Sequence, residues 1–520
     1  MTTGTSNAAV SASSPIPAAT GTQSSYTQIL KSSVLIGGSS ALGIVVRILR
    51  AKAMAVLLGP SGFGLFGLYG SVSDLAQNIS GMGINGSGVR QIAEAVGSGD
   101  EKKIARTVAV LRKTSVVLGV LGAVVLAVFS RQISVLTFGS SDHSGGIALL
   151  AMAVFFGSVT NGQSALIQGM RRIADFAKMG VWTGVGGAVS SIVLVYFLRE
   201  KGIVPSLVAV AAVTTLVAHS YSRKVKIRTP ALTFSEVRQD ASELLHLGFA
   251  FMSSALLTMG VAYATRVLLL RNEGFEATGL YQAAWTLGGL YVGFVLQAMG
   301  ADFYPRLTAS ASNDTVCNRL VNEQTRIGLL IAGPGLLATL TFAPLVIALF
   351  YSTKFIGAVA ILRWVCLGTT LQVISWPMGY IVLAKGKRNI FFWSEVAWAV
   401  VSLSLAWVCV TSFGATGAGI AFFGSYVFHA LFIYLVVGWL TGFQWSQENR
   451  VLGLLLLSFV AIVFCGAYVL SPVWAASVGI LAVLLSGAYS IRALTKLISL
   501  DELPQPVRKL LVAIGAVPSA

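Results

Sequence analysis

Three of the arginines that lie inside apolar stretches are candidates for chemistry, because a charged side chain is unusual there. Arg47 and Arg50 are three residues apart, which places them on one face of a helix. Arg266 lies in a second apolar stretch farther along the chain. Arginine presents a planar fork of N–H donors that suits the oxygens of a pyrophosphate group. These residues predict a cationic cavity wall, and the alternative for each is a side chain that extends to the membrane surface.

Other polar side chains occur in the apolar stretches at helical spacing. Asp74 is suited to pair with a neighbouring arginine or to bind a coupling ion, and hydrogen bonding between helices explains the polar residues about equally well. The stripe that includes Asp74 is Ser71, Asp74, Asn78, Gly81 and Asn85. Further cavity or coupling candidates are Gln168, Gln297 and Glu395. Amide and aromatic groups that suit the hydroxyl edge and apolar face of a sugar are Tyr281, Trp285, Gln297, Gln372, Trp376 and Tyr380.

The composition identifies the elements that must position these residues. The 520-residue chain is 55% hydrophobic and 11% charged, whereas soluble proteins average about 25% charged residues. Apolar runs of the length that crosses a bilayer as a helix recur along the chain. We therefore predict an all-α polytopic membrane protein with about 14 transmembrane helices. The expected spans are 32–57, 63–86, 108–130, 146–169, 178–198, 203–220, 243–270, 277–300, 326–350, 358–383, 390–411, 415–438, 451–470 and 473–491.

The net charge of +17 is a topology signal. Most Lys and Arg residues fall in the loops on the side of the two termini, and loops rich in Lys and Arg stay in the cytoplasm. Both termini are therefore expected in the cytoplasm. Because the excess is spread over many loops, it does not predict a nucleic-acid partner. The four cysteines and four histidines form no ligand motif, so neither a metal nor another cofactor is expected.

The stretch VLLGPSGFGLFGLYG (56–70) contains a formal G-x-G-x-x-G at Gly62, Gly64 and Gly67. A dinucleotide loop also needs an acidic residue about 20 positions later, and the first acid in that region is Glu94. A shift of 212 residues matches the stretch to LLLRNEGFEATGLYQA, where Gly64 becomes Glu276. The motif is therefore interpreted as a tight hairpin between two spans, repeated in two halves of six helices related by an axis along the membrane normal.

This hairpin, the polar second span and the basic loops QGMRRI (168–173) and KGKRNI (385–390) resemble a known family. Over about residues 28–495 the chain is similar to the O-antigen (Wzx-type) polysaccharide flippases of the multidrug/oligosaccharidyl-lipid/polysaccharide exporter superfamily. The resemblance implies two six-helix lobes around a central cavity, with spans 13 and 14 as an added pair. It also implies a bacterial cytoplasmic (inner) membrane location. The implied substrate is an undecaprenyl-pyrophosphate-linked glycan moved to the outer leaflet by alternating access, with the diphosphate on Arg47, Arg50 and Arg266.

The expected division of the chain follows from the spans. Residues 1–27 form a disordered tail, 28–222 the N-lobe, 223–242 a basic linker, 243–440 the C-lobe, 441–492 spans 13 and 14, and 493–520 a second cytoplasmic tail. No signal peptide is expected before the first span.

Several alternatives remain open at this point. A cation-coupled multidrug exporter of the same superfamily would need acids in the cavity, whereas arginines predominate here. A lipid II flippase differs only in its glycan. A glycan polymerase or ligase would need large outer loops with catalytic groups, so we do not expect an enzyme. The absence of G-x-x-x-x-G-K-[ST] suggests no ATPase subunit. The membrane potential, H⁺ or Na⁺ remain as driving forces, and the polysaccharide polymerase machinery and the lipid bilayer as partners.

Overall fold

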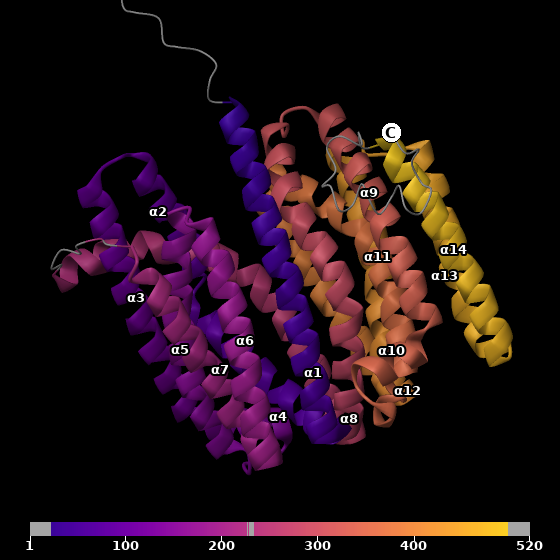
Figure 1. Ribbon diagram of the computed structural model, residues 1–520, viewed down its shortest axis with the longest axis horizontal. Helices are drawn as coiled ribbons and strands as arrows, with labels where there is room; N and C mark the ends of the chain where they lie inside the picture. The colour runs from indigo at the N-terminus through magenta and orange to yellow at the C-terminus, as the bar shows by residue number, and fades with distance from the viewer. Residues whose placement is uncertain (1–21, 226, 228–232, 498–520) are drawn as a thin grey trace, which may run out of the picture.

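The computed structural model describes residues 22–225, 227 and 233–497. Within these ranges the chain is helical, with no strands (Figure 1). The first half contains α1 (Thr22–Gly81), α2 (Ile84–Gly97), α3 (Glu101–Val128), α4 (Ser130–Phe138), α5 (Ser144–Gly169), α6 (Ile173–Leu198) and α7 (Ile203–Ser222). The second half contains α8 (Phe234–Ala309), α9 (Asp314–Thr341), α10 (Ala343–Phe350), α11 (Ala358–Ala384), α12 (Arg388–Thr441), α13 (Gln447–Val469) and α14 (Pro472–Leu497). Short 3-10 turns follow α6 and α10 at Arg199–Gly202 and Thr353–Phe355.

The three longest helices are each broken at one glycine. Gly59 in α1, Gly274 in α8 and Gly414 in α12 all have positive φ and a non-helical backbone. Glycine adopts positive φ without a Cβ clash, so each helix divides there into two segments. By length and composition, seven helical stretches in the described chain can cross a membrane, or eight with α9 and α10 taken together. Two of these stretches, 173–222 and Arg388–Thr441, are long enough for two crossings each.

The helices form two lobes and an added pair (Figure 1). Helices α2 to α7 lie on one side, α9 to α12 lie on the other, and α1 and α8 pack against each other between them. Helices α13 and α14 lie at the outer edge and pack on α9. This arrangement confirms the predicted all-α fold with two lobes and a C-terminal pair.

Backbone conformations correct the register of the repeat. Three pairs of positive-φ residues are each 215 positions apart: Gly59 with Gly274, Arg171 with Gly386, and Arg199 with Gly414. The sequence match at 212 was therefore wrong by three residues. Small and apolar residues recur so often in membrane helices that several registers match, whereas a backbone break marks the same turn in both lobes.

Two predicted spans end differently in the structure. The span at 326–350 is not one helix, because α9 ends at Thr341 and α10 turns away by 84°, with a proline in the first turn of α10. The second span ends at Gly81, because Met82 and Gly83 have positive φ.

The predicted boundaries between the parts of the chain stay predictions. Most of the tail at 1–27 lies outside the described residues, and α1 already begins at Thr22. Of the second tail at 493–520, only the part up to Leu497, the last residue of α14, is described.

Candidate functional site

The glycine motif lies at a close contact between the lobes. A Cβ on Gly64 would collide with the carbonyl oxygen of Phe275, and a Cβ on Gly279 would collide with that of Pro60. Gly64 and Gly279 are themselves 215 positions apart, so equivalent residues of the two repeats meet here. The predicted close packing is present, but it joins the two lobes, a role that the sequence did not reveal.

We call the end of the molecule that holds Gly59, Gly274 and Gly414 the hairpin end. Side chains also join the lobes there: the Arg271 guanidinium donates to the carbonyl oxygens of Val135 (2.9 Å) and Leu136 (2.6 Å) in the last turn of α4. The hydroxyls of Thr137 and Tyr263 are 2.7 Å apart. The hairpin end is therefore closed by both backbone and side-chain contacts.

The opposite end, which holds Arg171 and Gly386, is called the loop end. There Arg106 forms a two-pronged ion pair with Asp240, with N–O distances of 2.6 and 3.2 Å. The carbonyl of Gly248 lies where a Cβ on Gly83 would be. The second segment of α1 thus touches α8 near both of its ends.

Arg266 is buried between these two ends, with 7% of its surface exposed. Its Nε donates to Gln282 Oε1 (2.7 Å), and its Nη1 donates to the carbonyl of Ala262 (2.8 Å). Gln282 packs in turn against Gly67 of α1, where a Cβ would lie 2.9 Å from Oε1. The guanidinium also lies 5.9 Å from the centre of the Tyr281 ring. Arg266 is therefore held at the interface between the lobes.

Arg50 lies in the first segment of α1 and contacts the second segment near Gly67. Its guanidinium lies 5.7 Å from the ring centre of Phe66, the residue before Gly67. Its Nε is buried without a hydrogen-bond partner in the described structure. Arg47 is exposed one turn earlier. Asp74 is solvent-accessible and interacts electrostatically with Arg266, but they form no ion pair within 4.0 Å.

The other predicted candidates are dispersed. Asn78 lies one turn after Asp74, and its Oδ1 is buried without a partner among the described residues. Asn85 is not on the predicted polar stripe, because the break at Met82 and Gly83 places it on α2. Gln168 is half-buried in the last turn of α5. Gln297 lies in α8, but its side chain is outside the described residues.

The remaining candidate, Glu395, lines a cavity of about 630 Å³ inside the C-lobe. We call this cavity the C-lobe pocket; its walls come from α8, α11 and α12. Five of the residues that the sequence singled out as suited to a sugar lie in its walls: Tyr281, Trp285, Gln372, Trp376 and Tyr380. The sequence identified these residues by type but did not place Glu395 with them.

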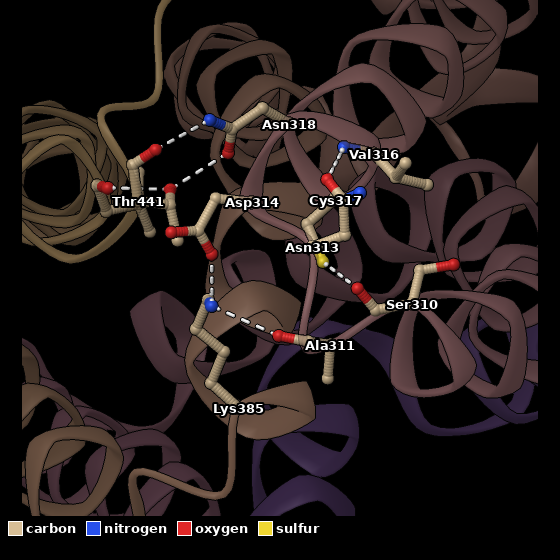
Figure 2. Close-up of polar contacts among 10 residues, drawn as sticks. Ser310, Ala311, Asn313, Asp314, Val316, Cys317, Asn318, Lys385 and Thr441 are labelled. Carbon is tan, nitrogen blue, oxygen red and sulfur yellow. Dashed lines mark hydrogen bonds and ion pairs between the residues drawn. The ribbon is translucent and has the colours of Figure 1, made fainter.

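A polar network fixes the loop end of the C-lobe (Figure 2). Lys385 pairs with Asp314 and donates to the carbonyl of Ala311 (3.1 Å). Asn318 donates to the carbonyl of Thr441 (2.9 Å), and the Thr441 hydroxyl donates back to Asn318 Oδ1 (2.8 Å). These bonds tie the start of α9 to the ends of α11 and α12, so the walls of the C-lobe pocket are held together at this end.

Similar proteins support the fold and identify the family. Residues 53–360 match the family described as "Polysaccharide biosynthesis protein". The chain is 23% identical over 416 residues to the lipid III flippase of Escherichia coli (strain K12), covering 77% of this chain and 95% of that protein. Among solved structures, it resembles the lipid II flippase MurJ in an inward closed conformation (TM-score 0.66, 13% identity, 89% and 99% covered). It also resembles an inward-facing MATE multidrug transporter of the MOP superfamily (TM-score 0.63, 18% identity, 76% and 94% covered).

These relatives are named as flippases and transporters, which agrees with the expectation that the chain is not an enzyme. The family match covers more than half of the sequence, and the fold resembles those of the MurJ and MATE structures. The chain is therefore a multi-pass membrane protein that belongs to the polysaccharide biosynthesis protein family.

Proposed function

We propose that this protein flips a lipid-linked glycan, specifically an undecaprenyl-pyrophosphate-linked repeat unit, from the cytoplasmic to the outer leaflet. The observation that carries the proposal is Arg266, a buried cation at the interface between the lobes. A charged group at the centre of a bilayer costs about 2.5–3.5 kcal/mol on insertion scales. Such a residue is retained where it has a partner, and an anionic substrate is one.

The arrangement leaves donors for that substrate. A guanidinium has five N–H groups, and described residues accept from two groups of Arg266, at Nε and Nη1. The buried Nε of Arg50 has no partner in the described part of the protein. Arg50 of α1 contacts Phe66, and Arg266 of α8 bonds Gln282, which packs on the next residue, Gly67. Two arginines so placed, one from each lobe, suit the two phosphates of a diphosphate. Arg47, one turn from Arg50, would add charge at the entrance.

Asp74 gives this site a means of responding to the substrate. It competes with a diphosphate for Arg266, so substrate binding would weaken the attraction between the segments that carry them. Protonation of Asp74, or a Na⁺ ion bound there together with Asn78, would have the same effect. The membrane potential also favours outward movement of negative charge, by about 2.3 kcal/mol per charge and 100 mV.

Alternating access would then be a rocking of the two lobes about the contact between Gly64 and Gly279. We place the loop end, with its many Lys and Arg residues, in the cytoplasm and the hairpin end on the outer side. We further propose that both termini lie in the cytoplasm of a bacterium and that the protein is in its inner membrane. A polysaccharide polymerase that uses the flipped glycan is the expected partner.

Depletion of the protein in cells tests this proposal. The lipid-linked glycan should accumulate where an impermeant lectin cannot reach it, and wild-type protein should restore access. Arg266→Ala and Arg47→Ala should fail to restore it. Arg363→Ala is the matched control: like Arg50 it has a buried Nε without a partner among the described residues, but it lies against Tyr468 of α13, at the outer edge of the molecule. Normal glycan export with altered sensitivity to toxic cations would refute the proposal and favour a drug exporter.

A further inference from the structure

We propose that the C-lobe pocket binds the sugar next to the diphosphate and selects repeat units in which that sugar is uncharged. This inference rests on the proposed function, since it assumes a glycan diphosphate at Arg266. It adds a second subsite, with its own residues and its own specificity.

The first argument is position. Ala262, Thr265 and Tyr281 line the C-lobe pocket. Ala262 accepts a hydrogen bond from Arg266, and Tyr281 lies against the guanidinium of the same residue. The wall of the pocket is therefore in contact with Arg266. A sugar bonded directly to a diphosphate at Arg266 would be at the entrance of the pocket.

The second argument is the chemistry of the walls. Aromatic rings from all three wall helices line the pocket, including Tyr281, Trp376 and Trp398. Such rings pack on the apolar C–H face of a sugar, while polar groups bind its hydroxyls. The volume of about 630 Å³ lies within the range of 300–1,000 Å³ that is typical of small-molecule sites.

The third argument is a row of unsatisfied polar groups on α12. Glu395, Trp398 and Ser402 are three and four residues apart and line the pocket together. The indole N–H of Trp398 and the hydroxyl of Ser402 are buried, and neither has a hydrogen-bond partner in the described structure. Buried polar groups are normally paired, and each unpaired one needs an explanation. Sugar hydroxyls would satisfy both.

The fourth argument is charge. Glu395 is the only Asp, Glu, Lys or Arg in the described lining of the pocket. Besides the tyrosines, the one further ionisable group in this described lining is His429, whose Nδ1 is 3.0 Å from the Ser375 hydroxyl. A carboxylate accepts hydrogen bonds from sugar hydroxyls or from the N–H of an N-acetyl group, but it repels a second carboxylate. The pocket therefore accepts neutral and N-acetylated sugars and disfavours uronic acids.

Calorimetric titration of the full-length protein tests this proposal. The probes are a short-chain prenyl diphosphate alone, the same diphosphate carrying one N-acetylhexosamine, and the same diphosphate carrying one hexuronic acid. For wild type, we expect the N-acetylhexosamine to lower Kd about tenfold, which is about 1.4 kcal/mol. The hexuronic acid should bring no gain.

Two variants isolate the pocket. In Glu395→Gln, the hexuronic acid probe should gain about tenfold in affinity relative to the bare diphosphate measured with the same variant. Trp398→Phe keeps an aromatic ring but removes the N–H donor, so it should reduce the gain from the N-acetylhexosamine several-fold. Trp439→Phe is the matched control, because Trp439 is 78% exposed and does not line the pocket.

The outcomes separate this inference from the proposed function. If the bare diphosphate binds in an Arg266-dependent manner but neither sugar changes Kd, the pocket assignment is wrong and the flippase proposal stands. Equal gains from both sugars, unchanged in Glu395→Gln, would overturn the charge selection. If no probe binds, the proposed function and this inference both fail.

Discussion

The substitution Gly64→Ala tests whether the glycine contact sets the closure of the hairpin end. The new Cβ would collide with the carbonyl of Phe275 and would lie 2.8 Å from the backbone nitrogen of Gly279. Both obstacles are backbone atoms, so no side-chain rotation relieves them. Relief requires the two lobes to separate at this end of the molecule.

The size of the effect follows from the cost of overpacking. An extra carbon in a tightly packed site typically costs 1–3 kcal/mol, and 1.4 kcal/mol is a factor of ten in an equilibrium. We therefore expect the population closed at the hairpin end to fall about 5- to 150-fold relative to the open one. Gly70→Ala is the control on the same helix, because a Cβ there meets nothing within 4 Å.

The separation of the lobes can be measured with one spin label on each lobe, at the exposed positions Gln132 and Lys354. The native cysteines are first replaced. Double electron–electron resonance should show a longer distance component for Gly64→Ala and none for Gly70→Ala. An unchanged distance distribution in Gly64→Ala, or the same shift in both variants, would refute the reasoning.

Three further predictions concern stability in detergent. Arg199 has a φ of 54° at the position equivalent to Gly414 in the other lobe. We therefore expect Arg199→Gly to raise the free energy of unfolding by about 1 kcal/mol and Gly414→Ala to lower it by about the same amount. Shifts of the opposite sign in thermal denaturation would contradict this. Burial lowers the pKa of His143, which outweighs the opposing effect of Asp142. Its contribution to stability is therefore present above the unfolded pKa of about 6.5 and is lost as pH falls. His143→Gln should flatten the change in melting temperature between pH 7 and 5, and an unchanged slope would argue against it. Asn449 is 4% exposed, and its side-chain amide donates to the backbone carbonyl of Asn322 (2.7 Å). Asn449→Ala should therefore lower the free energy of unfolding by about 1–3 kcal/mol and make α13 more susceptible to limited proteolysis. Wild-type behaviour of this variant would show that the bond contributes little.

The sequence predicted the helices well, because hydrophobic length is a property of each segment by itself. It failed where a helix end depends on backbone conformation. The span at 326–350 remained apolar across the bend at Phe342, and Asn85 continued a polar periodicity across a break at Gly83.

Contacts between distant segments were harder to predict. Arg266 was found because a cation in an apolar helix stands out from its neighbours. Gly64 was noticed for the wrong reason, since its partner Gly279 is known only once the lobes are assembled. Trp398 and Ser402 were missed because an apolar membrane helix contains many such residues, and only the pocket distinguishes the ones that lie unpaired.

Reconstitution tests the central claim most directly. The protein would be placed in liposomes that contain a fluorescent prenyl-diphosphate glycan, and an impermeant quencher would report how much of the lipid changes leaflet. We predict rapid movement with wild type and with Arg363→Ala, and movement at the protein-free rate with Arg266→Ala. Equal movement in wild type and Arg266→Ala, or none in any variant, would contradict the account.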